Sequence, residues 1–441
     1  MRDFFVTFIV FGSLPKLLFR PDLAVLMFYW LSFMNPHRLC WGFAMSVPFA
    51  FVTAIILLLS LLIWKEKKRI LWMPVNIILF IYILWMTVTT VFAFDPLAAW
   101  PLWDRMWRIQ LITFITMMVM TNQLNINRLV WVVSGSIGFY GIKGGIFTIL
   151  TGGGERVWGP DGTFIGGNNE IGLALCMTVP LFRFIMLQET KRYLKQGLLI
   201  AMLLCLVTIL GTQSRGALLG MICMVLFLIL KSRKKFVLIL LMVTIIPIII
   251  ALMPQTWHER MSTIKSYQAD TSAMGRINAW GAAFNIAKNH LTGGGFKGLP
   301  IPWVFEKYAA NPNDLHDAHS IYFQVLAEHG FIGLGLFLLI GFTAWRLASS
   351  LMKMTKDNID LQWVYDLSSM IQVSFIGYWS AGAFLGLADF DLYYCLISIL
   401  VGCKTYLNEY NISLISLPEV NQKAISTRNF VRPLLKKAND L

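Results

Sequence analysis

Charged side chains are scarce in this sequence, where Asp, Glu, Lys and Arg together make up 14% of the 441 residues. Soluble domains carry roughly 25% charged residues, so the composition excludes an ordinary soluble protein. Hydrophobic residues make up 57%, and the mean hydropathy is +0.65. The alternating pattern of a membrane-spanning β-barrel is absent as well. Apolar runs recur instead, many near the ~20 residues that a helix needs to cross a bilayer, and they predict an all-α polytopic membrane protein.

Cysteine pairs are also missing. No two cysteines have the CxxC spacing, and most lie inside apolar runs, which argues against a disulfide framework or a zinc site. The six cysteines are Cys40, Cys176, Cys205, Cys223, Cys395 and Cys403. The N-terminal segment has no small-residue cleavage site after its apolar run, so we expect it to be retained in the membrane.

Acidic residues are outnumbered by basic ones, which leaves a formal net charge of +14. The excess falls in short segments between apolar runs, as in the cytoplasmic loops of membrane proteins. It therefore predicts the orientation of the chain and not a nucleic-acid partner. The clusters are Lys65, Lys67, Lys68 and Arg69; Lys191, Arg192 and Lys195; Lys231, Arg233, Lys234 and Lys235; and Arg346, Lys353 and Lys356.

The runs and clusters together predict about twelve transmembrane helices, or thirteen if residues 1–34 cross twice. The expected spans are 4–19, 22–34, 47–64, 72–94, 109–121, 128–150, 170–187, 197–213, 216–230, 236–253, 319–345, 367–388 and 390–407. Residues 95–108 are expected as an external turn with interfacial tryptophans. The chain then divides into N-terminal helices (1–253), an external loop (254–318), C-terminal helices (319–407) and a basic cytoplasmic tail (408–441).

The stretch 254–329 is a long polar interruption, and it holds five of the six histidines. Such an insert between hydrophobic segments indicates a function. Within it, apolar and polar residues recur at helical spacing, which predicts an amphipathic helix on the outer membrane surface. The apolar positions are Ile277, Trp280, Phe284 and Ala287, and the polar positions are Asn278, Asn285 and Lys288.

Three residues are candidates for chemistry. Arg215 lies between two apolar runs, where a charge is costly and favours a function, although an arginine can also reach the lipid headgroups from there. Arg276 could bind a diphosphate together with Arg215, because two guanidinium groups can donate several hydrogen bonds to it. Alternatively, Arg276 could stack on Trp280 as a cation–π pair. His319 opens the next apolar run, either as a general base or as a structural residue.

Two further patterns raise the question of a metal ion. His316 and His319 form His-x-x-His, to which Glu328 could add a carboxylate. Asp389 and Asp391 spell D-x-D, although two carboxylates at a membrane turn more often form a polar cap. The His-Glu-x-x-His motif of metalloproteases is absent. We expect no metal ion and no cofactor.

Four motifs stand out along the chain: Ser-Arg-Gly at 214–216, Gly-Arg-x-x-x-Trp at 275–280, His-Ser-x-Tyr-x-Gln-x-x-x-Glu-x-Gly-x-x-Gly at 319–333, and the loop from Arg156 to Asn169. Together they resemble the motifs of the O-antigen ligase and polymerase superfamily of bacterial membrane glycosyltransferases. The N-terminal third resembles exosortase-associated O-glycosylation ligases through segments 1–15, 31–38 and 95–111. Many superfamily members have His-Asn where this chain has His319-Ser320.

The resemblance implies a C-type glycosyltransferase fold in the bacterial inner membrane, with the active site facing the periplasm. The implied reaction is metal-independent, inverting transfer of a preassembled glycan from undecaprenyl diphosphate to a hydroxyl of lipid A core, another glycolipid, a polysaccharide or a protein. Arg215 and Arg276 are implied to bind the diphosphate, and His319 to act as general base. The other motif residues are expected to bind substrate: Arg156, Asn168, Asn169, Trp280, His316 and Tyr322.

Three alternatives remain open at this point. The same chemistry could polymerise lipid-linked repeat units. A transporter of polyprenyl-linked sugars would need charges inside several spans, and Lys143 and Arg183 are the main examples here. A metal-dependent hydrolase would depend on His316 and His319 alone.

Overall fold

The computed structural model describes residues 1–66, 70–232, 235–236, 239–240, 244, 254–262 and 271–415. All regular structure in these ranges is helical, as the apolar runs predicted. The predicted span at 236–253 lies largely outside the described residues, and most of the predicted tail at 408–441 does too.

The first half of the chain forms helices close to the predicted spans. Pro21 at the first turn of α2 and Asn35 in the left-handed conformation after it fix the ends of that helix. The elements are α1 (Arg2–Phe19), α2 (Pro21–Met34), η1 (Pro36–Leu39), η2 (Phe43–Ser46), α3 (Phe49–Ile63), α4 (Pro74–Val91), α5 (Pro96–Val119), α6 (Gln123–Leu150), α7 (Asn168–Gln188), α8 (Arg192–Gly211) and α9 (Arg215–Lys231).

In the described part of the second half, shorter helices lie in the polar insert and longer ones follow it, with the short η4 between two of the longer helices. They are α11 (Gln255–Ser262), α12 (Thr271–Asn289), α13 (Pro302–Tyr308), α14 (Ile321–Thr355), η4 (Ile359–Leu361), α15 (Gln362–Gly382) and α16 (Asp391–Ile415). The insert is therefore not an open loop.

The expected external turn at 95–108 is helical instead. Asp95 caps α5 by accepting a hydrogen bond from the Ala98 N–H at 3.1 Å, and Pro96 occupies the first helical position. Both are strong signals for a helix start. The three tryptophans of this segment lie along the first turns of α5, where Trp103 stacks on Trp107 at 6.5 Å between ring centroids.

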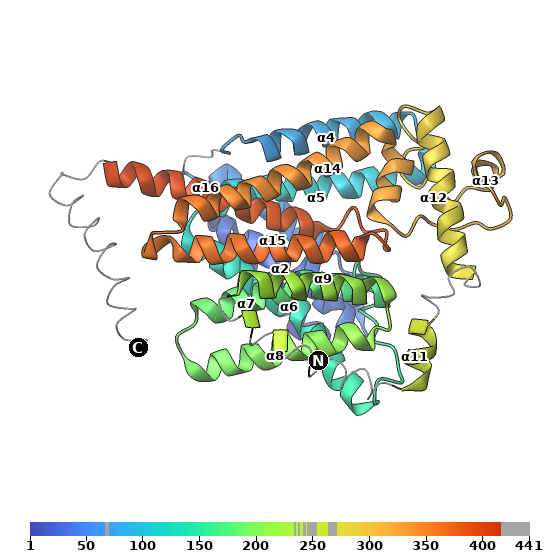
Figure 1. Cartoon of the computed structure of the whole chain (residues 1–441). Helices are drawn as coiled ribbons and strands as arrows, with labels where there is room; N and C mark the ends of the chain where they lie inside the picture. The colour runs from blue at the N-terminus through green and yellow to red at the C-terminus, as the bar shows by residue number, and fades with distance from the viewer. Residues whose placement is uncertain are drawn as a thin grey trace.

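The long helices run roughly parallel, and α12 crosses their direction at one end, with α11 and α13 beside it (Figure 1). We refer to this as the α12 end. α15 packs against α7 and α9, and α14 packs against α4, α12 and α15. Large apolar side chains are exposed on α3, α4 and α8, where a bilayer would cover them.

Five helices in the described part of the chain are long and apolar enough to cross a membrane: α4, α6, α7, α8 and α14. α2 and α3 are apolar but shorter. These helices indicate a multi-pass membrane protein, while the total of about twelve spans stays a prediction.

Candidate functional site

Arg215 is the first residue of α9, at a tightly built turn. Ser214 caps the helix by accepting from the Ala217 N–H at 3.2 Å. Gln213 just before it has a φ of 52°, a left-handed conformation that is uncommon for a residue with a side chain. The turn therefore holds the half-buried Arg215 at the helix start.

The loop before α7 is fastened to this turn by side chains. Arg156 donates from Nε to Oε1 of Gln213 at 3.2 Å, and Gln213 donates from Nε2 to the carbonyl of Gly153 at 3.1 Å. Asn168 donates to the Thr212 carbonyl at 2.9 Å. The predicted substrate residues Arg156 and Asn168 thus lie beside Arg215, and Asn168 is buried as a support of the turn. Asn169 follows on the first turn of α7, half-buried.

Arg276 and Trp280 lie one turn apart on α12. Arg276 donates from Nη1 to the Phe384 carbonyl at 3.4 Å. Trp280 stacks on Phe323, with centroids 4.8 Å apart and planes at 7°, and donates from Nε1 to the Ala318 carbonyl at 2.6 Å. One face of the Trp280 ring is thus covered by Phe323, and no cation–π contact between Arg276 and Trp280 is found among the described residues. Trp280 anchors the residue that precedes His319.

The predicted faces of α12 are partly wrong. Ile277 and Phe284 are exposed as expected of a membrane-facing side, but Asn278, expected on the polar side, is buried. Its amide donates to the Asn311 carbonyl at 2.8 Å and its oxygen accepts from the Asn311 N–H at 2.9 Å. Three alanines lie on the buried face, where α12 packs on α13 and α14. The apolar residues of this face are Ala279, Ala282, Ala283 and Ile286.

His319 has a φ of 42°, again in the left-handed region. Ala318 on one side is held by Trp280, and on the other Ser320 begins α14. Burial lowers the pKa of His319, and the nearby Arg276 guanidinium lowers it further, while Asp317 opposes the shift. The lowered pKa favours the neutral imidazole, which is the form that accepts a proton.

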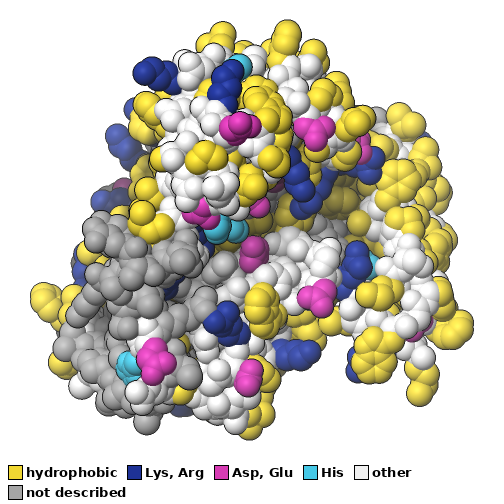
Figure 2. Space-filling model, turned by 90° about the vertical axis from the view of Figure 1, so that its right-hand side faces the viewer, with side chains coloured by type: hydrophobic (Ala, Val, Ile, Leu, Met, Phe, Trp, Pro, Cys, Tyr) yellow, Lys and Arg dark blue, Asp and Glu magenta, His cyan; other side chains and the backbone are white. Residues whose placement is uncertain are grey.

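Phe384 connects the two arginines. Its carbonyl accepts from Arg276, and its Cβ would lie 3.0 Å from a Cβ built on Gly216, the residue after Arg215. The same turn approaches His319, since a Cβ on Gly386 would lie 3.8 Å from the Cα of His319. Arg215, Arg276 and His319 thus surround the turn between α15 and α16. Figure 2 shows the α12 end as a hollowed face with basic, acidic and histidine side chains around the hollow.

Two other predicted substrate residues have protein partners. The Tyr322 hydroxyl donates to the Trp379 carbonyl at 3.0 Å, which ties α14 to α15. His316 Nδ1 lies 2.8 Å from Asp314 Oδ1, and the ring packs against Gly275 beside Arg276. Glu328 approaches Gln324 and the Lys297 N–H, and the described residues contain no group of three His, Cys, Asp or Glu side chains able to hold a metal ion.

The D-x-D carboxylates face other groups. Asp391 accepts from the Ser32 hydroxyl at 2.5 Å. Burial raises the pKa of Asp389 to about 6, and the Arg105 guanidinium opposes this rise. Arg105 itself lies over the Phe164 ring at 3.5 Å. The sequence did not lead us to predict Gln213, Phe384 or Arg105 as site residues. Of these, Gln213 could have been predicted, because it is a polar residue close to Arg215 between two apolar runs.

Comparison with known proteins gives two family matches. A model described as O-antigen ligase matches residues 200–338, which include Arg215, Arg276 and His319. A model of a family of unknown function matches residues 1–190. No curated protein matches the chain.

Proposed function

We propose that the chain belongs to the O-antigen ligase superfamily, whose model matches residues 200–338, and that it transfers a preassembled glycan from undecaprenyl diphosphate to an acceptor hydroxyl. Its family and apolar helices make it an O-antigen ligase- or polymerase-like membrane glycosyltransferase that handles a lipid-linked glycan and an acceptor. The proposal adds the donor, the ligase role, and a site at the periplasmic face of the inner membrane.

Under this proposal the reaction is an inverting displacement. His319 accepts the proton of the acceptor hydroxyl as its oxygen attacks the anomeric carbon. The bond from that carbon to the diphosphate oxygen breaks, and the electron pair leaves with the undecaprenyl diphosphate. Arg215 and Arg276 donate to the diphosphate and stabilise the negative charge that grows on it. The low pKa of His319 suits the role, because a neutral imidazole is needed before each turnover.

The proposal is supported mainly by the packing around Phe384, where α12, the start of α9 and the segment just before α14 come together. Its carbonyl accepts from Arg276, and its side chain packs against the start of α9. Two cations near one base match what a diphosphate leaving group requires. Arg156 would extend the cationic surface, because Gln213 ties it to the Arg215 turn.

The test is transfer activity of the purified protein with undecaprenyl-diphosphate glycan and candidate acceptors, with and without chelator. We expect Arg215→Ala, Arg276→Ala and His319→Ala each to lose at least ~100-fold in activity, the range for removing a charge-stabilising donor or a general base. Lys288→Ala on α12 and His258→Ala on α11, both exposed, are matched controls that should keep activity.

Full activity in all three site variants would refute the assignment, and loss of wild-type activity with chelator would favour a metal-dependent reaction. Comparing the products formed with different acceptors distinguishes a ligase from a polymerase. A ladder of products from lipid-linked repeats alone would indicate polymerisation. Single transfer to lipid A core, polysaccharide or protein would indicate ligation.

A further inference from the structure

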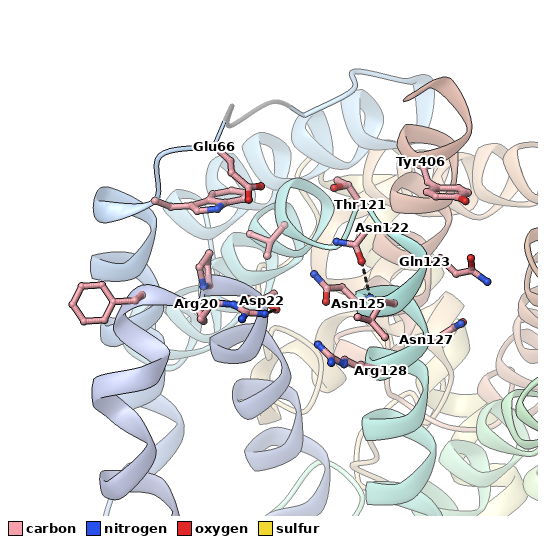
Figure 3. Close-up of a pocket in the computed structure, with 15 residues that line it drawn as sticks. Arg20, Asp22, Glu66, Thr121, Asn122, Gln123, Asn125, Asn127, Arg128 and Tyr406 are labelled. Carbon is pink, nitrogen blue, oxygen red and sulfur yellow. Dashed lines mark hydrogen bonds and ion pairs between the residues drawn. The ribbon is translucent and has the colours of Figure 1, made fainter. Parts of the chain in front are cut away.

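A cavity lies at the start of α6, whereas the Arg215 turn lies near the other end of that helix, where Gln213 bonds to Gly153. Its volume is about 1040 Å³, and it opens between the ends of α1, α2, α3, α5, α6 and α16 (Figure 3). α6 begins at this cavity and runs 28 residues toward the α12 end, about 42 Å at the helical rise. The proposed transfer reaction gives this cavity no role.

One wall of the cavity is polar and comes from the start of α6. Asn122 caps the helix by accepting from the Asn125 N–H at 2.9 Å. Asn125 and Arg128 follow at three-residue intervals and extend toward Arg20 and Asp22 (Figure 3). The Asn125 side chain makes no hydrogen bond with any residue that the structure describes, although the residue is only 8% exposed. Asn127, which also lines the cavity, has its side-chain oxygen buried without a hydrogen-bond partner among those residues. A buried polar atom without a partner is costly, which points to a bound ligand.

The charges around the cavity are of both signs. Arg20 and Asp22 form a two-bond ion pair at 2.9 and 2.7 Å, and Arg20 also interacts electrostatically with Glu66. Arg128 makes no ion pair with any residue that the structure describes, and Glu66 lines the cavity from the end of α3. Residues 67–69, which follow Glu66, lie outside the described ranges. A ligand that pairs with Arg128 and Glu66 carries one negative and one positive group.

The position of each charge distinguishes the two ends of that ligand. The exposed N–H groups at the start of α6 favour a phosphate, and the Arg128 side chain points back toward them because helical side chains lean to the N-terminus. A primary ammonium can donate hydrogen bonds to Glu66. At the rim, Phe19 and Leu124 are 67% and 58% exposed, as suits a site open to acyl chains.

We propose that this cavity binds the headgroup of a glycerophospholipid that carries a phosphodiester and a primary ammonium. The phosphodiester lies against Arg128 and the first turn of α6, and the Asn125 amide donates to it. The ammonium lies toward Glu66. The acyl chains leave past Phe19 and Leu124 into the bilayer.

The experiment titrates the full-length purified protein with single lipids and counts bound molecules by native mass spectrometry. Dioleoyl phosphatidylethanolamine is the probe, dioleoyl phosphatidylglycerol tests the ammonium, and water-soluble glycerophosphoethanolamine tests the acyl chains. We expect Arg128→Gln to weaken phosphatidylethanolamine binding about tenfold, as for loss of a charge-assisted hydrogen bond. Arg192→Gln, an exposed arginine outside the cavity, should leave binding unchanged.

Glu66→Gln gives an independent readout, because it should abolish the preference for phosphatidylethanolamine over phosphatidylglycerol while leaving the protein folded. Equal binding of both lipids to the wild type would overturn the proposal, and so would unchanged binding in Arg128→Gln. Glycerophosphoethanolamine that binds as tightly as the lipid would show that the ligand is soluble, which also overturns it. These outcomes do not depend on transfer activity.

Discussion

His319 is distinguished from the neighbouring histidines by its backbone and by the charge beside it. Its left-handed conformation is strained for a residue with a side chain, and such strain persists where surrounding contacts maintain it. Trp280 supplies one of these contacts through the Ala318 carbonyl. In contrast, His329 is buried against Phe296 and Thr89 inside α14, and we assign it a packing role.

The charge of Arg276 gives a pH prediction. Burial and Arg276 lower the pKa of His319 from 6.5. The neutral, proton-accepting form therefore persists below pH 6.5, and kcat/KM should fall on acidification only below that pH. In Arg276→Gln one cause of the shift is removed. The acidic limb of the residual activity should therefore move to higher pH, measured against Lys288→Gln as control. A limb that stays in place would mean that the two groups do not interact.

Arg215, Arg276 and His319 were singled out because each stands in a motif of unusual residue types for a membrane segment; their roles in catalysis stay predictions. Phe384 was not predictable, since its contribution is a backbone carbonyl that any residue could supply. The burial of Asn278 was also hidden, because its partners are carbonyls of a loop more than thirty residues away. Contacts with backbone atoms carry little sequence signature.

α14 has a break at Gly330, where φ is 67° and ψ is −171°. The break frees the carbonyls of Ala327 and Glu328 from the helix, and they accept from Gly294 and Gly295 at 2.8 and 2.9 Å. The glycine-rich segment after α12 is thereby joined to the half of α14 that follows His319. The break connects the polar insert to the membrane helices.

Two glycines of α14 form a matched pair for testing this break. A Cβ on Gly330 would lie 2.4 Å from the Leu291 carbonyl oxygen, whereas one on Gly335 would meet nothing within 4 Å. Gly330→Ala should cost at least about 2 kcal/mol, from backbone strain and the contact together. Gly335→Ala should be neutral or slightly stabilising, because alanine favours the helix. Thermal unfolding followed by tryptophan fluorescence measures both, and equal midpoints would contradict the role of the break.

Helix positions were predictable in most of the described chain, because membrane spans need long apolar runs. The start of α5 was not, since its tryptophans and charges suggested an interface, while the Asp95 cap and Pro96 extended the helix back to them. The buried face of α12 escaped prediction for a different reason. Small residues allow close helix packing, but their spacing does not tell which face of a helix is buried unless the neighbouring helix is known.

At the scale of the whole molecule, the orientation in the membrane is testable with new cysteines. Lys297 is exposed beside the α12 end, and Arg192 is exposed at the start of α8. An impermeant maleimide should label Lys297→Cys in intact cells and Arg192→Cys only after lysis. The wild type is the blank, because five of its six cysteines are buried. The opposite labelling pattern would overturn the proposed periplasmic site.

The turn at Phe384 joins segments that the chain supplies from far apart: α9 from its first half, and α12 with α14 from its second. A molecule that touches both Arg215 and Arg276 therefore binds only the packed arrangement of these helices. By thermodynamic linkage, such a molecule at a hundred times its Kd adds about 2.7 kcal/mol to the stability of that arrangement. The lipid-linked donor would then act as a structural ligand of the bundle even before any acceptor arrives.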